Sequence, residues 1–149
     1  MSRRGFTLIE MLSVFAIMAL LAALALPKLS TVQTKAEATS VIADYGVIRH
    51  AALDVLETTG SWPVTGADGE VPAGMATSLP GGFQFTHGAT TYRWRTWALP
   101  DGLPGNPSDT VVVGVEVSSD NAELMASLRQ LYRGPLAFGT NTRMTLVIE

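Results

Sequence analysis

The first apolar run of the chain predicts a membrane-spanning helix. From Phe6 to Leu26 every residue is apolar except Thr7, Glu10 and Ser13. A helix rises about 1.5 Å per residue, so this run matches the roughly 30 Å hydrocarbon core of a bilayer. We therefore expect the segment to lie in a membrane.

A second helical pattern follows the apolar run and predicts that the helix continues to about Glu57. Apolar residues recur there at intervals of three and four, the spacing of one helical face; they are Ala38, Val41, Tyr45, Ile48, Ala52 and Val55. Pro27, between the two patterns, either ends the first helix or kinks a longer one, because proline removes a backbone donor and clashes with the preceding turn. Gly60 marks the end of the second part.

The remainder of the chain reads as a small α+β domain. Glycine and proline are frequent in residues 64–82 and 99–109, which predicts loops there. Alternating or β-branched residues predict strands, and a leucine face after Ser119 and Asp120 predicts a helix. The expected strands are 82–86, 90–98, 110–118 and 143–149, and the helix is 121–132. We expect a small antiparallel sheet packed on the long helix.

Glu10 is out of place in an apolar run. An ionised side chain near the bilayer centre costs at least about 2.5 kcal/mol, and carboxylates within membranes usually have a partner. Glu10 lies near one end of the run, where it could reach the headgroups.

Two export signals compete for this stretch. SRRGF resembles a twin-arginine signal, and Ala23-Leu24-Ala25 is a pattern that signal peptidase cuts, which would free a soluble chain starting at Leu26.

A third signal fits the residues better. The sequence GFTLIE, from Gly5 to Glu10, follows a short basic leader and precedes a long apolar run. This combination resembles the N-terminus of type IV pilins and type II secretion pseudopilins. The apolar run also exceeds the roughly 7 to 15 residues of a signal h-region. ETTGSWP at residues 57–63 is similar to the helix exit of many pseudopilins, so the resemblance covers about the first 63 residues.

The resemblance implies a processing event and a function. Prepilin peptidase would cut between Gly5 and Phe6, and the new amine of Phe6 would be methylated. Pro27 would be a kink within one helix. Glu10 would meet the Phe6 amine of a neighbouring subunit in a filament. The implied fold is pilin-like α+β, with a leader at 1–5, a membrane and filament-core helix at 6–27, its amphipathic continuation at 28–58 and a periplasmic domain at 59–149.

The implied protein is a structural subunit of a type II secretion pseudopilus or a type IV pilus-like filament. It would first reside in the bacterial inner membrane as a single-pass protein. Its partners would be other pilin or pseudopilin subunits, prepilin peptidase, an inner-membrane assembly platform and the lipid bilayer. No cofactor is expected.

Composition narrows this interpretation. The 149 residues carry a formal charge of −3, and removal of Arg3 and Arg4 leaves 8 basic and 13 acidic side chains, a net of −5. An acidic chain argues against general nucleic-acid binding, so no nucleic-acid partner is expected. The chain has no cysteine. Many type IV pilins close their C-terminal region with a disulfide, so this departure favours a pseudopilin over an adhesin-like pilin.

Catalysis has little support in the sequence, and we expect no enzyme. His50 and His87 lack the partner spacing of a metalloprotease, and the chain has no nucleophile motif or glycine-rich phosphate loop. Three oxygen-bearing loop residues, Asp101, Asn106 and Asp109, are weak calcium candidates.

One strand carries a candidate binding surface. In TYRWRTWAL, Tyr92 and Trp94 share one face, and Arg93, Arg95 and Trp97 share the other. Arginines beside an exposed aromatic residue could bind DNA or a secreted substrate, which would make the chain a pilin-like binding module. Arginines more often stack on their own tryptophan, and we favour that arrangement here.

Overall fold

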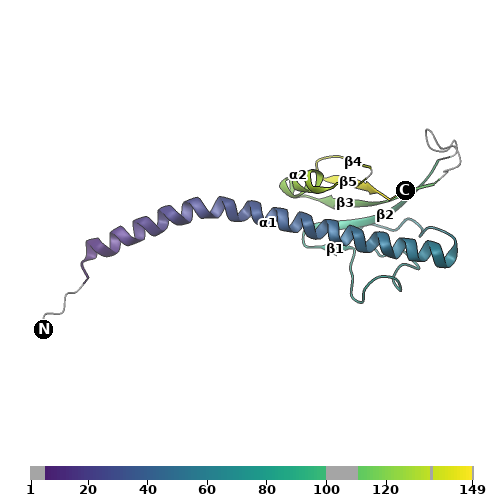
Figure 1. Cartoon of the computed structure of the whole chain (residues 1–149), viewed down its shortest axis with the longest axis horizontal. Helices are drawn as coiled ribbons and strands as arrows, with labels where there is room; N and C mark the ends of the chain where they lie inside the picture. The colour runs from purple at the N-terminus through teal and green to yellow at the C-terminus, as the bar shows by residue number, and fades with distance from the viewer. Residues whose placement is uncertain (1–5, 100–110, 135, 149) are drawn as a thin grey trace. The chain divides into compact units, whose positions relative to one another are not determined.

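The computed structural model describes residues 6–99, 111–134 and 136–148. The chain divides into two compact units, residues up to Thr34 and residues from Lys35 onward. The first helix, α1 (Leu8–Thr59), has 52 residues and contributes to both units. The sheet and the second helix belong to the second unit (Figure 1).

Helix α1 continues through residue 27, so the alternative in which Pro27 ends the helix is wrong. The kink at this position stays a prediction. The amphipathic face is as predicted, because Ala38, Val41 and Ile48 are fully buried. The helix ends with a left-handed glycine: Gly60 has a φ of 73°, and its N–H donates to the Leu56 carbonyl at 2.8 Å.

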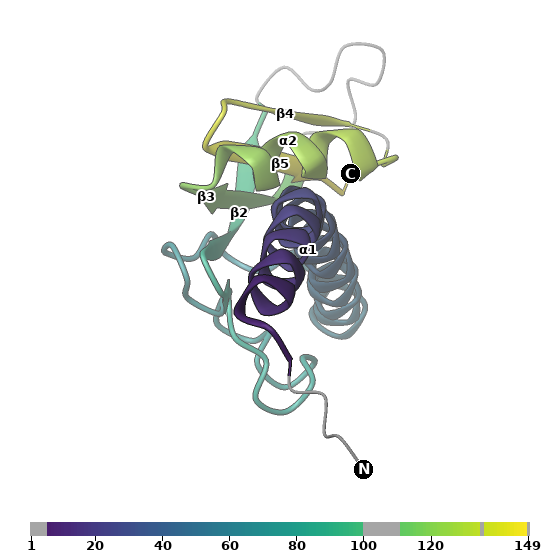
Figure 2. The same ribbon diagram turned by 90° about the vertical axis from the view of Figure 1, so that its left-hand side faces the viewer.

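Within the described residues, five antiparallel strands form one sheet in the order β1-β2-β3-β5-β4. The strands are β1 (Thr86–His87), β2 (Thr90–Ala98), β3 (Val111–Ser119), β4 (Ala137–Gly139) and β5 (Arg143–Val147). Helix α2 (Ala122–Leu131) follows β3 and lies beside β3 and β5 (Figure 2). The expected α+β, pilin-like arrangement of a long helix on a small antiparallel sheet is confirmed.

Both helices pack against one face of the sheet, which we call the inner face. A single hydrophobic cluster joins α1, α2 and the inward side chains of the strands, including the fully buried Tyr92 and Trp94. The Tyr45 hydroxyl on α1 donates to the Val147 carbonyl at 3.1 Å. Its ring also meets the Tyr132 ring edge-on at 5.8 Å between centroids, so α1 and the end of α2 are in contact.

A loop protects the free edge of β2. The Gly69 N–H donates to the Tyr92 carbonyl at 2.9 Å, and the Gly66 N–H donates to the Trp94 carbonyl at 3.3 Å. The Thr65 hydroxyl accepts from the Thr96 N–H at 3.0 Å. The loop thus satisfies backbone groups that the two-residue β1 leaves unpaired.

Three local predictions need correction. The strand expected at 82–86 is wrong: Gly82 has a φ of 82°, which an extended strand does not allow, and strand begins only at Thr86. Phe85, in the irregular segment between them, is a fully buried core side chain. The cap of α2 is Asn121, not Ser119 or Asp120: its carboxamide oxygen accepts from the N–H groups of Glu123 and Leu124, both at 3.1 Å.

The third correction concerns the end of the chain. Strand β4 was not predicted, because three residues beside a proline give no alternating pattern. Strand β5 was expected at 143–149 and ends at Val147. Thr145 and Val147, on the face opposite Leu146, are buried as Leu146 is. The charged side chains described below cover that opposite face.

Candidate functional site

Thr7 and Glu10 form a reciprocal cap at the start of α1. One carboxylate oxygen of Glu10, Oε2, accepts from the Thr7 N–H and from the Thr7 hydroxyl, each at 2.8 Å. In return the Glu10 N–H points at the Thr7 hydroxyl oxygen at 3.4 Å. This is a capping box, in which side chains three residues apart satisfy backbone donors at the helix start.

The capping box was missed at the level of sequence, although Thr-x-x-Glu before an apolar run is its recognised signature. Glu10 therefore has polar partners within its own helix. Phe6 directly precedes this cap and is exposed, whereas Gly5 lies outside the described residues. Cleavage between Gly5 and Phe6, and pairing of Glu10 with a Phe6 amine, stay predictions.

The first unit exposes large apolar side chains along its whole length, among them Leu8, Leu12, Phe15, Leu20 and Leu24. Within the described residues, α1 is the helix long and apolar enough to cross a membrane, with a mean hydropathy of 2.4 in its most apolar window. Exposing apolar surface to water costs about 25 cal/mol of free energy per Å², so this surface would be unfavourable in water. It requires a bilayer or other protein surfaces around it.

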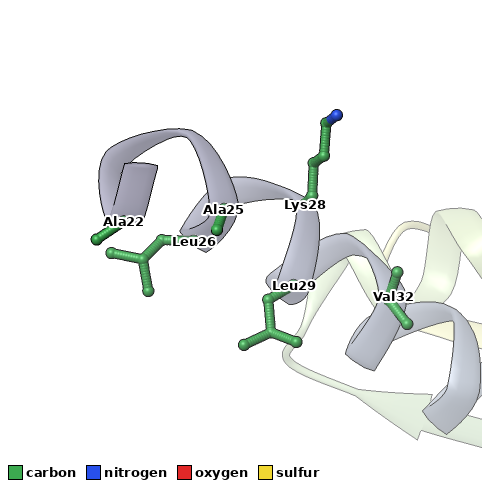
Figure 3. A pocket seen from close by; sticks show the side chains of 6 residues that line it. All are labelled: Ala22, Ala25, Leu26, Lys28, Leu29 and Val32. Atoms are coloured by element: carbon green, nitrogen blue, oxygen red, sulfur yellow. The ribbon is translucent and has the colours of Figure 1, made fainter. Parts of the chain in front are cut away.

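An open apolar groove marks the C-terminal end of this unit. Its volume is about 540 Å³, and it is lined by Ala22, Ala25, Leu26, Lys28, Leu29 and Val32. Figure 3 shows Leu26 and Leu29 pointing to one side of the helix and the Lys28 ammonium pointing to the other. The small alanines leave the groove hollow, and the lysine gives this stretch its one charge. This arrangement suits the boundary between an apolar phase and water.

The candidate binding residues Arg93, Arg95 and Trp97 lie on the face of β2 opposite the buried Tyr92 and Trp94 and face away from the helices. Arg93 donates through Nε to the Gly66 carbonyl at 2.9 Å and through Nη1 to Asp68 at 3.2 Å. The guanidinium of Arg95 lies 5.5 Å from the centre of the Trp97 ring, so the favoured stacking arrangement is confirmed for Arg95 but not for Arg93. Intramolecular contacts thus occupy both arginines.

A buried carboxylate completes this surface and was missed from the sequence. Glu116 on β3 is 7% exposed and lies 2.8 Å from Nη1 of Arg143 and 4.0 Å from Nη1 of Arg95. Arg143 also lies 4.0 Å from Asp68. We call Asp68, Arg93, Arg95, Glu116 and Arg143 the outer-face network. The one available signal was a single charged residue inside the apolar run VVVGVEV.

A second polar cluster ties α1 to the β1–β2 hairpin. One oxygen of Asp44 accepts from the Tyr92 hydroxyl at 2.8 Å and lies 3.0 Å from Nδ1 of His87. Burial, together with the neighbouring Asp44 carboxylate, raises the pKa of Tyr92 well above its usual value, so the phenol stays a donor. The contact of His87 with Asp44 thus joins elements of the fold. His50 is exposed on α1.

The described part of the chain contains no candidate metal site. No group of three or more His, Cys, Asp or Glu side chains in residues 6–99, 111–134 and 136–148 is placed to hold an ion. The calcium candidates Asp101, Asn106 and Asp109 lie outside those residues.

Comparison with known proteins identifies the N-terminus. Residues 1–26 match the prokaryotic N-terminal methylation motif, the signature of prepilin-type signals in type IV pilins and pseudopilins. A comparison with curated proteins gives no match, and a comparison with solved structures gives none either. The motif supports a pilin-like protein that prepilin peptidase processes and that assembles with other pilin subunits. Together with the exposed apolar helix, it fits anchoring in a membrane.

Proposed function

We propose that this chain is a structural subunit of a type II secretion pseudopilus or a type IV pilus-like filament. The observation that carries the proposal is the methylation motif at residues 1–26, which leads without a break into a helix with an exposed apolar surface. The subunit waits in the inner membrane with residues 59–149 in the periplasm. An assembly platform then moves it into the filament. The absence of cysteine favours the secretion pseudopilus.

In this proposal, Glu10 of the capping box pairs with the Phe6 amine of a neighbouring subunit. Cleavage after Gly5 creates an amine at Phe6, immediately before Thr7. A carboxylate has about four acceptor positions, so Glu10 can keep both hydrogen bonds from Thr7 and still accept from a neighbour's amine. At low dielectric that ion pair is strong, and a shifted register would leave both charges unpaired. The pair therefore selects one register between neighbouring helices.

The folded domain serves as a structural and not a catalytic part of the subunit. In support, two of its polar contacts join elements of the fold: Asp44 links α1 to Tyr92, and Glu116 links β3 to Arg143 on β5. These contacts hold the sheet on the helix.

N-terminal mass spectrometry of the mature chain tests the proposal. We expect a chain that starts at N-methylated Phe6 and sediments with membranes. A soluble chain starting at Leu26 would instead establish the signal-peptidase alternative. Deletion of the gene, followed by separate assays of protein secretion and of surface pili, would then distinguish a pseudopilus from a pilus.

A further inference from the structure

The outer face of the sheet carries an apolar patch beside exposed arginines. The rings of Trp97 and Phe138 lie 6.3 Å apart, and Phe138 is 53% exposed. Leu136, two residues before Phe138 along the chain, is 55% exposed. We call these three residues the outer-face patch. Aromatic residues with arginine at their side are typical of the energetically important parts of protein interfaces.

The charge around this patch is net positive by one, because the three arginines of the outer-face network meet two carboxylates, Asp68 and Glu116. The Arg143 side chain is 51% exposed and the Arg95 side chain 31%, whereas the Glu116 carboxylate between them is only 9% exposed. Glu116 holds Arg95 and Arg143 in place but presents little negative charge to solvent. Asp68, with a 49% exposed side chain, is the exposed carboxylate of the network and pairs with Arg93 and Arg143. The surface therefore fits a partner that carries carboxylates.

The end of α1 offers that chemistry. Asp54 and Glu57 lie near its C-terminus, and its last turn has no basic residue. Carboxylates at a helix C-terminus are unfavourable beside the negative end of the helix dipole. Asp54 accepts from Ser78, but Glu57 has no ionic or hydrogen-bonding partner within the described ranges. This end of the helix is therefore a negative surface without an internal counter-charge.

We propose that the outer-face patch and its arginines bind the Asp54 and Glu57 end of α1 from a second copy of this chain. Helix α1 packs on the inner face of the sheet, so the two surfaces lie on opposite faces of one subunit. A contact between two different surfaces of identical subunits is heterologous, and it propagates as an open filament unless the rotation closes a ring. The inference rests on the proposed function, because it names a subunit contact within the proposed filament.

Cysteine cross-linking tests the contact, since the chain has no cysteine of its own. Full-length Trp97→Cys is co-expressed with full-length Thr58→Cys, and the cells are treated with a short bis-maleimide. Thr39→Cys replaces Thr58→Cys as the control. Both threonines are exposed on α1, and both hydroxyls bond the carbonyl four residues earlier. They are separated by about 28 Å along the helix.

We expect a cross-linked dimer from the Trp97 and Thr58 pair and none from the Trp97 and Thr39 pair. Adding Glu57→Lys to the Thr58→Cys chain should lower the dimer yield about fivefold, as should high salt. Filaments without the Thr58 cross-link, or equal cross-linking from both pairs, would overturn the inference and leave the proposed function standing. A parent chain that is neither cut at Phe6 nor recovered in sheared filaments would overturn both.

Discussion

The Glu10 carboxylate accepts two hydrogen bonds from Thr7, one from the backbone N–H and one from the hydroxyl, at 2.8 Å each. An acidic residue that seemed anomalous in an apolar helix is therefore part of the start of that helix. The same carboxylate thus has a local role in capping and a proposed role in subunit pairing, which substitutions can separate.

Replacing Glu10 should separate capping from charge. Glu10→Ala removes both, whereas Glu10→Gln keeps an oxygen for the Thr7 donors and removes the negative charge. We expect both variants to insert into the membrane and to be cleaved, and both to be lost from the sheared filament fraction. Immunoblots of membrane and sheared fractions measure this. Normal assembly of Glu10→Gln would show that charge is not required.

Removing the buried carboxylate of the outer face should destabilise the domain. Glu116→Ala leaves Arg95 and Arg143 without their shared partner, and we expect a loss of about 1 to 3 kcal/mol in the free energy of unfolding. Urea denaturation of the detergent-solubilised chain measures it. Glu123→Ala, at an exposed position on α2, is the control and should change stability by less than about 1 kcal/mol.

The buried Tyr92 and the partly buried Tyr45 predict a loss of stability at alkaline pH. Burial raises the pKa of Tyr92 and of Tyr45 above the usual value of about 10. The folded state then keeps protons that the unfolded state releases, so stability is full below pH about 10 and falls as the pH rises beyond it. Urea midpoints measured from pH 8 to 11 should show this fall. Tyr92→Phe should weaken the pH dependence and cost about 0.5 to 1.5 kcal/mol at neutral pH.

Two glycines predict opposite effects of the same substitution. A Cβ at Gly114 on β3 would lie 2.7 Å from the Leu146 carbonyl oxygen, whereas a Cβ at Gly46 on α1 would have no atom within 4 Å. Gly114→Ala should therefore destabilise the sheet, by about 1 to 3 kcal/mol. Gly46→Ala should stabilise the helix by up to about 1 kcal/mol. Thermal unfolding monitored by circular dichroism distinguishes them, and a neutral Gly114→Ala would contradict the close packing.

Much of the fold could be predicted because its patterns are local. Strand β2 was predicted at its observed bounds, and the stripe from Ala38 to Val55 was assigned to the correct face of α1. The parts that were missed depend on distant residues. Glu116 meets Arg143, which is 27 positions away along the chain, and spacing in the sequence carries no signal for that pair. Phe85 was predicted in a strand but lies in an irregular segment, where its ring is buried in the core. Contacts with distant residues outweigh local strand preference there.

The loop bonded along β2 limits how two copies of this chain can contact each other. Its hydrogen bonds from Gly66 and Gly69 occupy carbonyls that another chain would need in order to add a strand. Two copies therefore cannot extend the sheet from one molecule to the next at these positions. Contacts between such copies are thereby left to side chains and helices, which can separate again, instead of continuous sheets, which rarely do.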